Sequence, residues 1–303
     1  MHSRKFLISV ASVLLISILL VNCANDKEAR LVELSDFKSE YVIPRNVSIW
    51  LPPGYASDGE GFPVLYMHDG QNLFDSTKAY IGAEWGVDEW ISKLMAEKKL
   101  PATIVVGIWN TKYRFREYDP AKPFYNLPDS AQSRLVEEWG GVPLSDEYLK
   151  FVIKELKPYI DSHYNTLTDR EHTTIMGSSM GGLISAYALV EYPDVFGKAG
   201  CLSTHWPVSL INNDTAVSNE MVRYISQNLP AHHEFKIYFD RGSESLDSWY
   251  GEAQYFMDER LAKLGLIKGK QFESLIFEGD AHNENYWNKR LDIPLQFLLR
   301  SDR

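Results

Sequence analysis

Residues 174–182 read Thr-Ile-Met-Gly-Ser-Ser-Met-Gly-Gly and contain a Gly-x-Ser-x-Gly pentapeptide centred on Ser179. A short strand-like run precedes it, and residues 183–190 repeat apolar side chains at helical spacing. A strand that turns sharply into a helix at a serine exposes the hydroxyl as a nucleophile, and Gly177 and Gly181 leave room for that turn. The stretch therefore predicts Ser179 as a nucleophile; a Gly/Ser-rich surface loop is the alternative.

Strand-like and helix-like segments alternate along most of the chain. Strands are expected at residues 45–55, 63–70, 102–108, 171–176, 196–202, 234–240 and 272–279. Helices are expected at residues 85–97, 145–159, 183–190, 247–264 and 287–299. This order predicts a single α/β domain with a doubly wound, mostly parallel sheet, the α/β-hydrolase fold. The aperiodic residues 109–142 are expected to form a long excursion over the active-site face.

A serine nucleophile needs a base, and the base needs an orienting acid. In the α/β-hydrolase order the acid and then the histidine follow the serine, and His282 comes directly after the last expected strand. The loop after the preceding strand offers Asp240, Glu244 and Asp247. Asp240 sits at the strand end, where it can brace the turn. We expect Asp247 to be the acid, with Glu244 as the alternative.

Two backbone N–H groups are expected to form the oxyanion hole. One belongs to Met180, the residue after the nucleophile and the start of the helix. The other is assigned to Gln71, because Gly70 before it permits a tight turn after a buried strand. His68 and Asp69 could suggest a metal site, but no further ligands cluster there, so neither a metal nor a cofactor is expected.

The amino-terminal segment has the pattern of an export signal. Arg4 and Lys5 precede residues 6–21, which are apolar and uncharged. A leucine three places before Cys23 resembles a bacterial lipobox, although Asn22 departs from the small residue usual there. In such signals the cysteine becomes the lipidated first residue of an exported, membrane-anchored lipoprotein, periplasmic or at the cell surface. An ordinary secreted protein and an uncleaved anchor helix are the alternatives.

These observations predict a lipoprotein-type signal peptide at 1–22, a tether at 23–40 and a domain of the α/β-hydrolase type at 41–303. The second cysteine, Cys201, lies in an apolar segment and is expected to be a small buried core residue. If Cys23 is lipidated, no intrachain disulfide can form.

The charge of the chain limits its partners. A net charge of −10 disfavours binding to nucleic acid or to an anionic membrane by charge, so contact with a membrane surface is expected through the lipid anchor only. Aromatic residues are abundant and can stack on sugar or aryl groups. Those in or near the expected rim loops are Trp109, Tyr113, Trp206 and Trp249.

Four stretches together resemble the putative esterase family of α/β-hydrolases: residues 66–74, 177–182, 239–247 and 279–287. The resemblance spans about residues 42–299. The Asp-Gly-Gln loop and the Gly-x-x-His-x-x-x-x-Trp ending are more specific to this family than the Gly-x-Ser-x-Gly turn, the nucleophile elbow, which many hydrolases share. The family includes esterase D-like enzymes, carbohydrate esterases of family 1 type, siderophore-ester hydrolases and mycolyltransferases.

The resemblance implies a cofactor-free serine carboxylic ester hydrolase that works through an acyl-enzyme. It supports Ser179, His282 and the Gln71 amide, and it leaves the acid open because members place that carboxylate at different offsets after the glycine matching Gly242. The implied substrate is an esterified carbohydrate with acetyl or feruloyl groups. Siderophore-ester hydrolysis, acyl transfer to a sugar and a non-catalytic binding module are the alternatives; the oligomeric state is not predicted.

Overall fold

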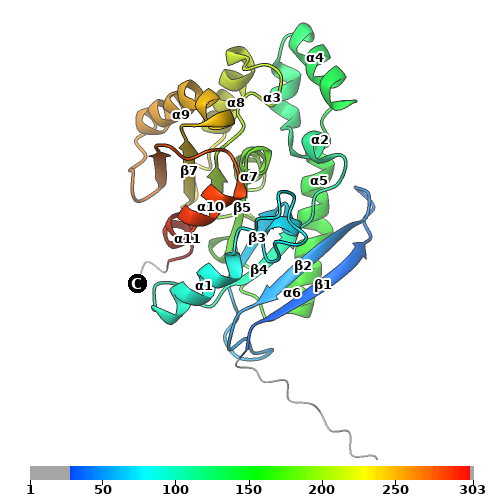
Figure 1. The fold of residues 1–303 in the computed structure, drawn as a ribbon, viewed down its shortest axis with the longest axis vertical. Helices are drawn as coiled ribbons and strands as arrows, with labels where there is room; N and C mark the ends of the chain where they lie inside the picture. Colours follow the sequence, from blue (N-terminus) through cyan, green and yellow to red (C-terminus); the bar gives the residue numbers. More distant parts are fainter. Residues whose placement is uncertain (1–27, 301–303) are drawn as a thin grey trace, which may run out of the picture.

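The computed structural model describes residues 28–300, which are built around one eight-stranded sheet (Figure 1). The strand order is β1-β2-β4-β3-β5-β6-β7-β8, with β2 antiparallel to both β1 and β4 and all other neighbours parallel. The strands are β1 (Arg30–Phe37), β2 (Arg45–Leu51), β3 (Val64–His68), β4 (Ile104–Ile108), β5 (Thr173–Ser178), β6 (Lys198–Leu202), β7 (Lys236–Gly242) and β8 (Phe272–Phe277).

Helices cover both faces of this sheet (Figure 1). The α-helices are α1 (Val87–Ala96), α2 (Arg114–Tyr118), α3 (Ala121–Asn126), α4 (Asp129–Trp139), α5 (Ser145–Phe151), α6 (Lys157–His163), α7 (Met180–Glu191), α8 (Thr215–Gln227), α9 (Gly251–Lys263), α10 (Glu284–Arg290) and α11 (Asp292–Leu299). Side chains of α1, α10 and α11 form one apolar cluster, and those of α3 to α9 form a larger one on the other face. Within residues 28–300, no helix has the length and apolar character that a membrane crossing requires.

The middle strands are apolar along their whole length because water reaches neither face of the sheet there. Every residue of β3, β4 and β5 is buried, as expected for parallel strands covered by helices on both sides. The turns that follow β3, β5, β6, β7 and β8 meet at the carboxyl edge of the sheet, where ligands of open α/β sheets bind. The expected doubly wound α/β-hydrolase fold is confirmed.

The expected tether at 23–40 is wrong over much of its length, because residues 30–37 form the edge strand β1. Val32, Leu34 and Phe37 turn toward the larger apolar cluster. A bulge, with Asp36 at φ 51°, interrupts the alternation and hides the strand pattern in the sequence. Cys23 and the proposed signal peptide lie outside the described residues.

Residues 109–142 are not the aperiodic excursion that was expected, because they contain the three short helices α2, α3 and α4. Each of these helices buries only a few side chains, such as Tyr118, Phe124 and Leu135. So few apolar positions give no readable helical period. The helix α8 was also missed from the sequence, although its buried residues recur at helical spacing.

Candidate active site

Ser179 occupies the sharp turn between β5 and α7, with φ 59° and ψ −125°. Few residues other than glycine adopt a positive φ without strain, so the surrounding contacts must hold it. Its N–H donates to Leu202 O at 2.9 Å, and its own carbonyl accepts the His205 N–H at 3.1 Å. A Cβ on Gly177 would lie 2.8 Å from the backbone of Gly181, so only glycine fits where strand and helix cross.

An imidazole–carboxylate pair lies at the same edge of the sheet. His282 follows β8 and Asp247 follows β7, and His282 Nδ1 is 2.5 Å from Asp247 Oδ1. Asp247 is fully buried, whereas the alternative acid, Glu244, is exposed to solvent. The His282 main-chain N–H donates to Ser245 Oγ at 2.9 Å, which fixes the loop that carries the imidazole. The structure therefore brings His282 together with Asp247 and not with Glu244.

The second oxygen of Asp247 accepts two further hydrogen bonds. Ser203 Oγ lies 2.7 Å and Gly242 N 2.5 Å from Asp247 Oδ2. Burial acts to raise the pKa of Asp247, but the hydrogen bonds from His282, Ser203 and Gly242 outweigh it and hold the pKa below its usual value. Asp247 is thus an ionised acceptor. Gly242 has no space for a side chain, because a Cβ there would lie 2.1 Å from Asp280 O.

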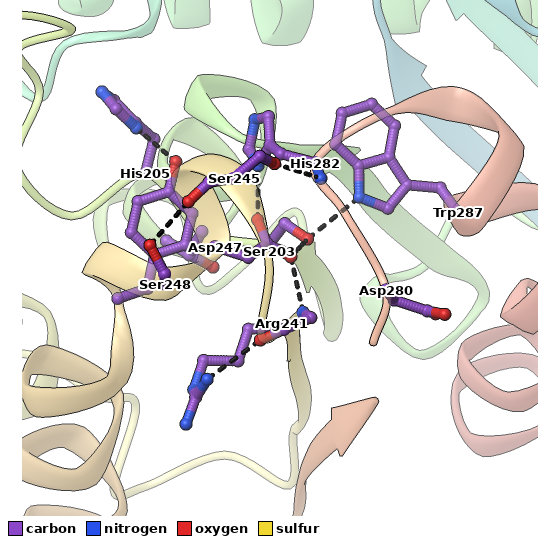
Figure 2. A network of polar contacts seen from close by, with 12 residues as sticks. Ser203, His205, Arg241, Ser245, Asp247, Ser248, Asp280, His282 and Trp287 are labelled. Atoms are coloured by element: carbon purple, nitrogen blue, oxygen red, sulfur yellow. Dashed lines mark hydrogen bonds and ion pairs between the residues drawn. The ribbon is translucent and has the colours of Figure 1, made fainter. Parts of the chain in front are cut away.

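Ser203 and Trp287 lie beside Asp247 and His282 (Figure 2), and the buried cation Arg290 bonds to this group. The Ser203 hydroxyl accepts from Trp287 Nε1 at 2.9 Å and from Arg290 Nη2 at 3.0 Å, so its own hydrogen is directed to the acid. Arg290 also donates to both oxygens of Asp240, at 3.0 and 3.2 Å, and to Asp280 at 2.9 Å. Asp240, which the sequence suggested as a brace for the turn, accepts the Ser203 N–H at 3.1 Å.

Aromatic rings fix the orientation of the His282 imidazole. The Trp287 ring lies edge-on to it, with centroids 5.0 Å apart and planes at 82°. The Tyr250 ring lies on another side, with centroids 5.7 Å apart and planes at 73°. The Tyr250 hydroxyl lies 2.6 Å from His205 Nδ1, and the main-chain N–H of His205 donates to the Ser179 carbonyl. Tyr250 therefore packs on the imidazole and is joined to the backbone of Ser179 through His205.

The two proposed oxyanion donors lie on neighbouring turns. Met180 is the first residue of α7, and Gln71 lies in the short 3₁₀ helix Gly70–Asn72 after β3. The loop before Gln71 packs on the start of α7, because a Cβ on Gly181 would lie 3.4 Å from Asp69 Oδ2. Within residues 28–300, the main-chain N–H groups of Gln71 and Met180 donate to no residue outside their own helices. Both amides are thus available to a ligand.

An ion pair fixes that loop. Asp69 has a left-handed backbone at φ 57°, and Arg114 Nε and Nη2 each lie 2.7 Å from its carboxylate oxygens. Asn110 Nδ2 adds a third bond at 2.7 Å, and its main-chain N–H donates to Gln71 Oε1 at 3.2 Å. The Gln71 side chain is therefore anchored as well. In the described part of the chain, no group of three or more His, Cys, Asp or Glu side chains is arranged to hold a metal ion.

Several residues of the site were not identified from the sequence. Ser203, His205, Tyr250 and Arg290 lie in segments without a recognisable motif, and their partners are distant in the chain. Among the aromatic residues suggested for the rim, Trp206 is instead buried in the core, with Nε1 3.3 Å from Gln254 Oε1. Trp109, Tyr113 and Trp249 are half-buried.

A hollow in the surface lies at the opposite edge of the sheet. This hollow, of about 520 Å³, lies at the amino ends of β6 and β7, lined by residues that include Lys198, Lys236 and Arg300. It contains none of the groups that surround Ser179. We therefore locate the candidate site by its chemistry and not by the size of a cavity.

A family model and several known proteins match this chain. The family model described as Putative esterase matches residues 42–298. The uncharacterized protein YbbA of Bacillus subtilis is 29% identical over 163 residues, which are 54% of this chain and 58% of that protein; the match thus spans little more than half of the relative's length.

Solved structures with the same fold include two esterases. A ferulic acid esterase from Anaeromyces mucronatus has a TM-score of 0.58 at 18% identity, with 89% of this chain and 91% of the other covered. The enterobactin esterase of Shigella flexneri has a TM-score of 0.64 at 18% identity, with 91% of this chain and 59% of the other covered. At this level of identity the likeness is one of fold.

Replacing Arg290 tests how much its buried ion pair with Asp240 contributes to the free energy of unfolding. We expect Arg290→Met to lower the free energy of unfolding by about 3–5 kcal/mol, because it leaves Asp240 buried without its cation. Arg223→Met, which breaks the ion pair of the exposed Arg223 with the half-buried Glu220, should cost less than about 1 kcal/mol. Urea unfolding of both variants measures the difference, and equal losses would contradict the role given to Arg290.

Proposed function

The chain belongs to the putative esterase family, a family of carboxylic ester hydrolases, and we propose that it cleaves esters through a serine acyl-enzyme. The observation that carries the proposal is the 2.5 Å bond between His282 Nδ1 and Asp247 Oδ1, at the edge of the sheet where Ser179 occupies its strained turn. An acid–imidazole pair beside an elbow serine is the arrangement that activates a hydroxyl nucleophile.

In the proposed acylation step, Ser179 Oγ attacks the ester carbonyl carbon. Asp247 accepts the hydrogen on His282 Nδ1, so the lone pair on Nε2 is left to take the serine proton. The carbonyl oxygen becomes an oxyanion, and the N–H groups of Gln71 and Met180 donate to it. Collapse of this intermediate breaks the ester C–O bond, and His282 returns the proton to the leaving alcohol.

Deacylation repeats these steps with water in place of the serine. His282 Nε2 takes a proton from the water, whose oxygen attacks the acyl carbon. The Ser179 oxygen then leaves with that proton, and the carboxylic acid is released. Asp247 stays ionised throughout and stabilises the imidazolium, in keeping with its lowered pKa.

As substrate we propose an acetyl or feruloyl ester of a carbohydrate. Trp109 follows β4 directly, and Trp249 lies two residues after Asp247; both are half-buried at the carboxyl edge, where a ring can stack on a sugar or an aryl group. The net charge of −10 disfavours polyanionic substrates. The ferulic acid esterase with the same fold lends further support.

A siderophore ester is the second candidate. Arg114 keeps 21% of its side chain exposed near the Gln71 loop, although Asp69 holds two of its nitrogens. A cation in this position can attract an anionic catecholate. The enterobactin esterase has the same fold.

We also propose that the chain is exported and held at a membrane surface through a lipid on Cys23, with secretion as the alternative. The support is the basic start, the apolar run at 6–21 and the leucine three places before the cysteine. The polar residues 24–28 then join the lipid to the folded domain.

The proposed triad predicts a graded loss of activity on p-nitrophenyl acetate. Ser179→Ala should reduce kcat by about 10⁵–10⁶-fold, since the nucleophile is gone. Asp247→Asn should reduce it by about 10⁴-fold through the wrong imidazole tautomer, while the exposed Glu244→Gln control stays within about twofold. Wild-type rates in Ser179→Ala would refute the serine mechanism, and loss in Glu244→Gln alone would reassign the acid.

The substrate proposal predicts a ranking of esters. Acetylated or feruloylated xylo-oligosaccharides should be cleaved with kcat/KM at least about tenfold above that of a cyclic catecholate trilactone, because stacking on Trp249 stabilises a bound sugar or aryl group. Acid release measured by chromatography gives the values for the wild type and for Trp249→Ala. The reverse ranking would favour the siderophore ester.

The lipid proposal predicts that a fatty-acid analogue labels the wild-type chain in an exporting bacterial host. Cys23→Ser removes the sulfur that the lipid is proposed to join, so labelling should vanish, whereas Cys201→Ser, which replaces a buried thiol, should keep it. A dye attached to the incorporated analogue shows, by fluorescence in a gel, whether each of the two variants is labelled. Persistent labelling of Cys23→Ser would refute the anchor.

A further inference from the structure

The turn that carries Gln71 is closed by a main-chain hydrogen bond between its two ends. The Asn72 N–H donates to the Asp69 carbonyl oxygen at 2.9 Å, and Gln71 lies inside the turn that this bond closes. The direction of the Gln71 N–H therefore follows from the backbone angles of Asp69 and Gly70. Asp69 has φ 57° and ψ 46°, a left-handed conformation that residues with a side chain adopt only uncommonly, so its contacts have to hold it.

Three donors hold the carboxylate of Asp69. Arg114 Nε and Nη2 bond to its two oxygens at 2.7 Å each, and Asn110 Nδ2 bonds to Oδ1 at 2.7 Å. Burial acts to raise the pKa of Asp69, but the charge of Arg114 and the hydrogen bonds from Arg114 and Asn110 outweigh it and hold the pKa below its usual value. The carboxylate is therefore ionised, and a bidentate pair of this kind fixes its plane as well as its position.

The turn itself is packed between two elements of the domain. A Cβ on Gly181 would lie 3.4 Å from Asp69 Oδ2, so the carboxylate lies against the first turn of α7, the helix that carries the second proposed oxyanion donor. On its other side, a Cβ on Gly70 would lie 2.4 Å from the main-chain carbonyl carbon of Gly107 in β4. The place of the turn is thus set by packing, and the contacts of Asp69 set the orientation of its peptide groups.

The helix α2 connects this turn to β2 through two ion pairs. Arg114, at the start of α2, bonds to Asp69. Three residues later, Glu117 bonds to Arg45 of β2 at 2.6 and 3.1 Å, and both side chains of this second pair are buried. Arg114 is therefore presented to the turn by a helix that is itself attached to the sheet.

We propose that Asp69 and Arg114 are positioning residues, which hold the Gln71 N–H in the direction that an oxyanion requires. The inference rests on the proposed serine mechanism and on the donor role of Gln71. In this role neither side chain touches the substrate, because the pair acts through the peptide group that joins Gly70 to Gln71. A donor that is oriented in advance stabilises the charge that develops in the transition state and adds little to binding of the ester. Loss of the pair therefore lowers kcat and leaves KM unchanged.

The second ion pair of α2 provides a matched control. Asp69→Asn and Glu117→Gln each replace the carboxylate of a buried pair with an amide of the same shape. Asparagine adopts the left-handed conformation more readily than most residues, so in Asp69→Asn the turn still forms but Arg114 no longer fixes it. A loss of stability alone affects both variants, whereas a positioning role separates them.

The first measurement is hydrolysis of p-nitrophenyl acetate by the full chain and its variants. Asp69→Asn should lower kcat by about tenfold with KM unchanged, which is less than the roughly 10²–10³-fold cost of a missing oxyanion donor. Glu117→Gln should stay within about twofold of the wild type. Arg114→Met should match Asp69→Asn, and Arg114→Lys, which keeps the charge without the bidentate bond, should recover part of the rate.

A second measurement reports on the oxyanion itself. The Ser179 oxygen adds to the carbonyl carbon of a trifluoromethyl ketone, the serine proton passes to His282, and the ketone oxygen becomes an anion in the place of the ester oxyanion. The inhibition constant should therefore rise about tenfold in Asp69→Asn, in step with the loss of kcat. In Glu117→Gln it should change by less than about twofold.

The outcomes separate this inference from the proposed function. If Ser179→Ala abolishes hydrolysis but Asp69→Asn and Glu117→Gln have the same kcat, the positioning role is wrong and the serine mechanism stands. A higher KM at an unchanged kcat would also overturn the role, because the pair would then bind substrate directly. If Ser179→Ala keeps the wild-type rate, both proposals are wrong. Should either amide variant fail to fold, Arg114→Lys and Arg114→Met decide the question by the same two measurements.

Discussion

The candidate site depends on one fully buried carboxylate, Asp247. This carboxylate stays ionised because hydrogen-bond donors surround both of its oxygens. Those donors come from His282, Ser203 and Gly242, so the ends of three strands must meet around its two oxygens. Since a buried carboxylate without partners is costly, the positions of these turns are linked to one another. Arg290 extends the linkage to Asp240 at the end of β7 and to Asp280 beyond β8.

The turn at Ser179 is a second constraint on the same edge of the sheet. Ser179 keeps its positive φ only while β6 and the chain after it bond to its amide and carbonyl. The residues that accept and donate there, Leu202 and His205, flank Ser203, which bonds to the acid. The short stretch at the end of β6 therefore supports both parts of the candidate site, namely the strained turn at Ser179 and the carboxylate of Asp247.

The fold could be predicted from the sequence, and the serine and histidine of the proposed triad have local signals. Ser179 lies in a pentapeptide, and His282 follows from chain order. The choice between Glu244 and Asp247 had no such signal, since it depends on a 3₁₀ turn that starts at Ser245 with φ 53°. The role of Arg290, which lies in no motif, depends on Ser203 and Asp240, and these residues come near it only when the chain folds. The edge strand β1 was missed because its bulge breaks the alternation.

The edge strand β1 also determines at which edge of the sheet the described chain begins. Arg30 pairs with Leu51, and β2 runs against β4, so the described chain begins at the amino edge of the parallel strands. Ser179 lies at the opposite, carboxyl edge, because it directly follows the last residue of β5. If the residues before β1 hold the domain at a surface, as we propose, the candidate site faces away from that attachment. The proposed anchor and an ester substrate then use opposite edges of the sheet.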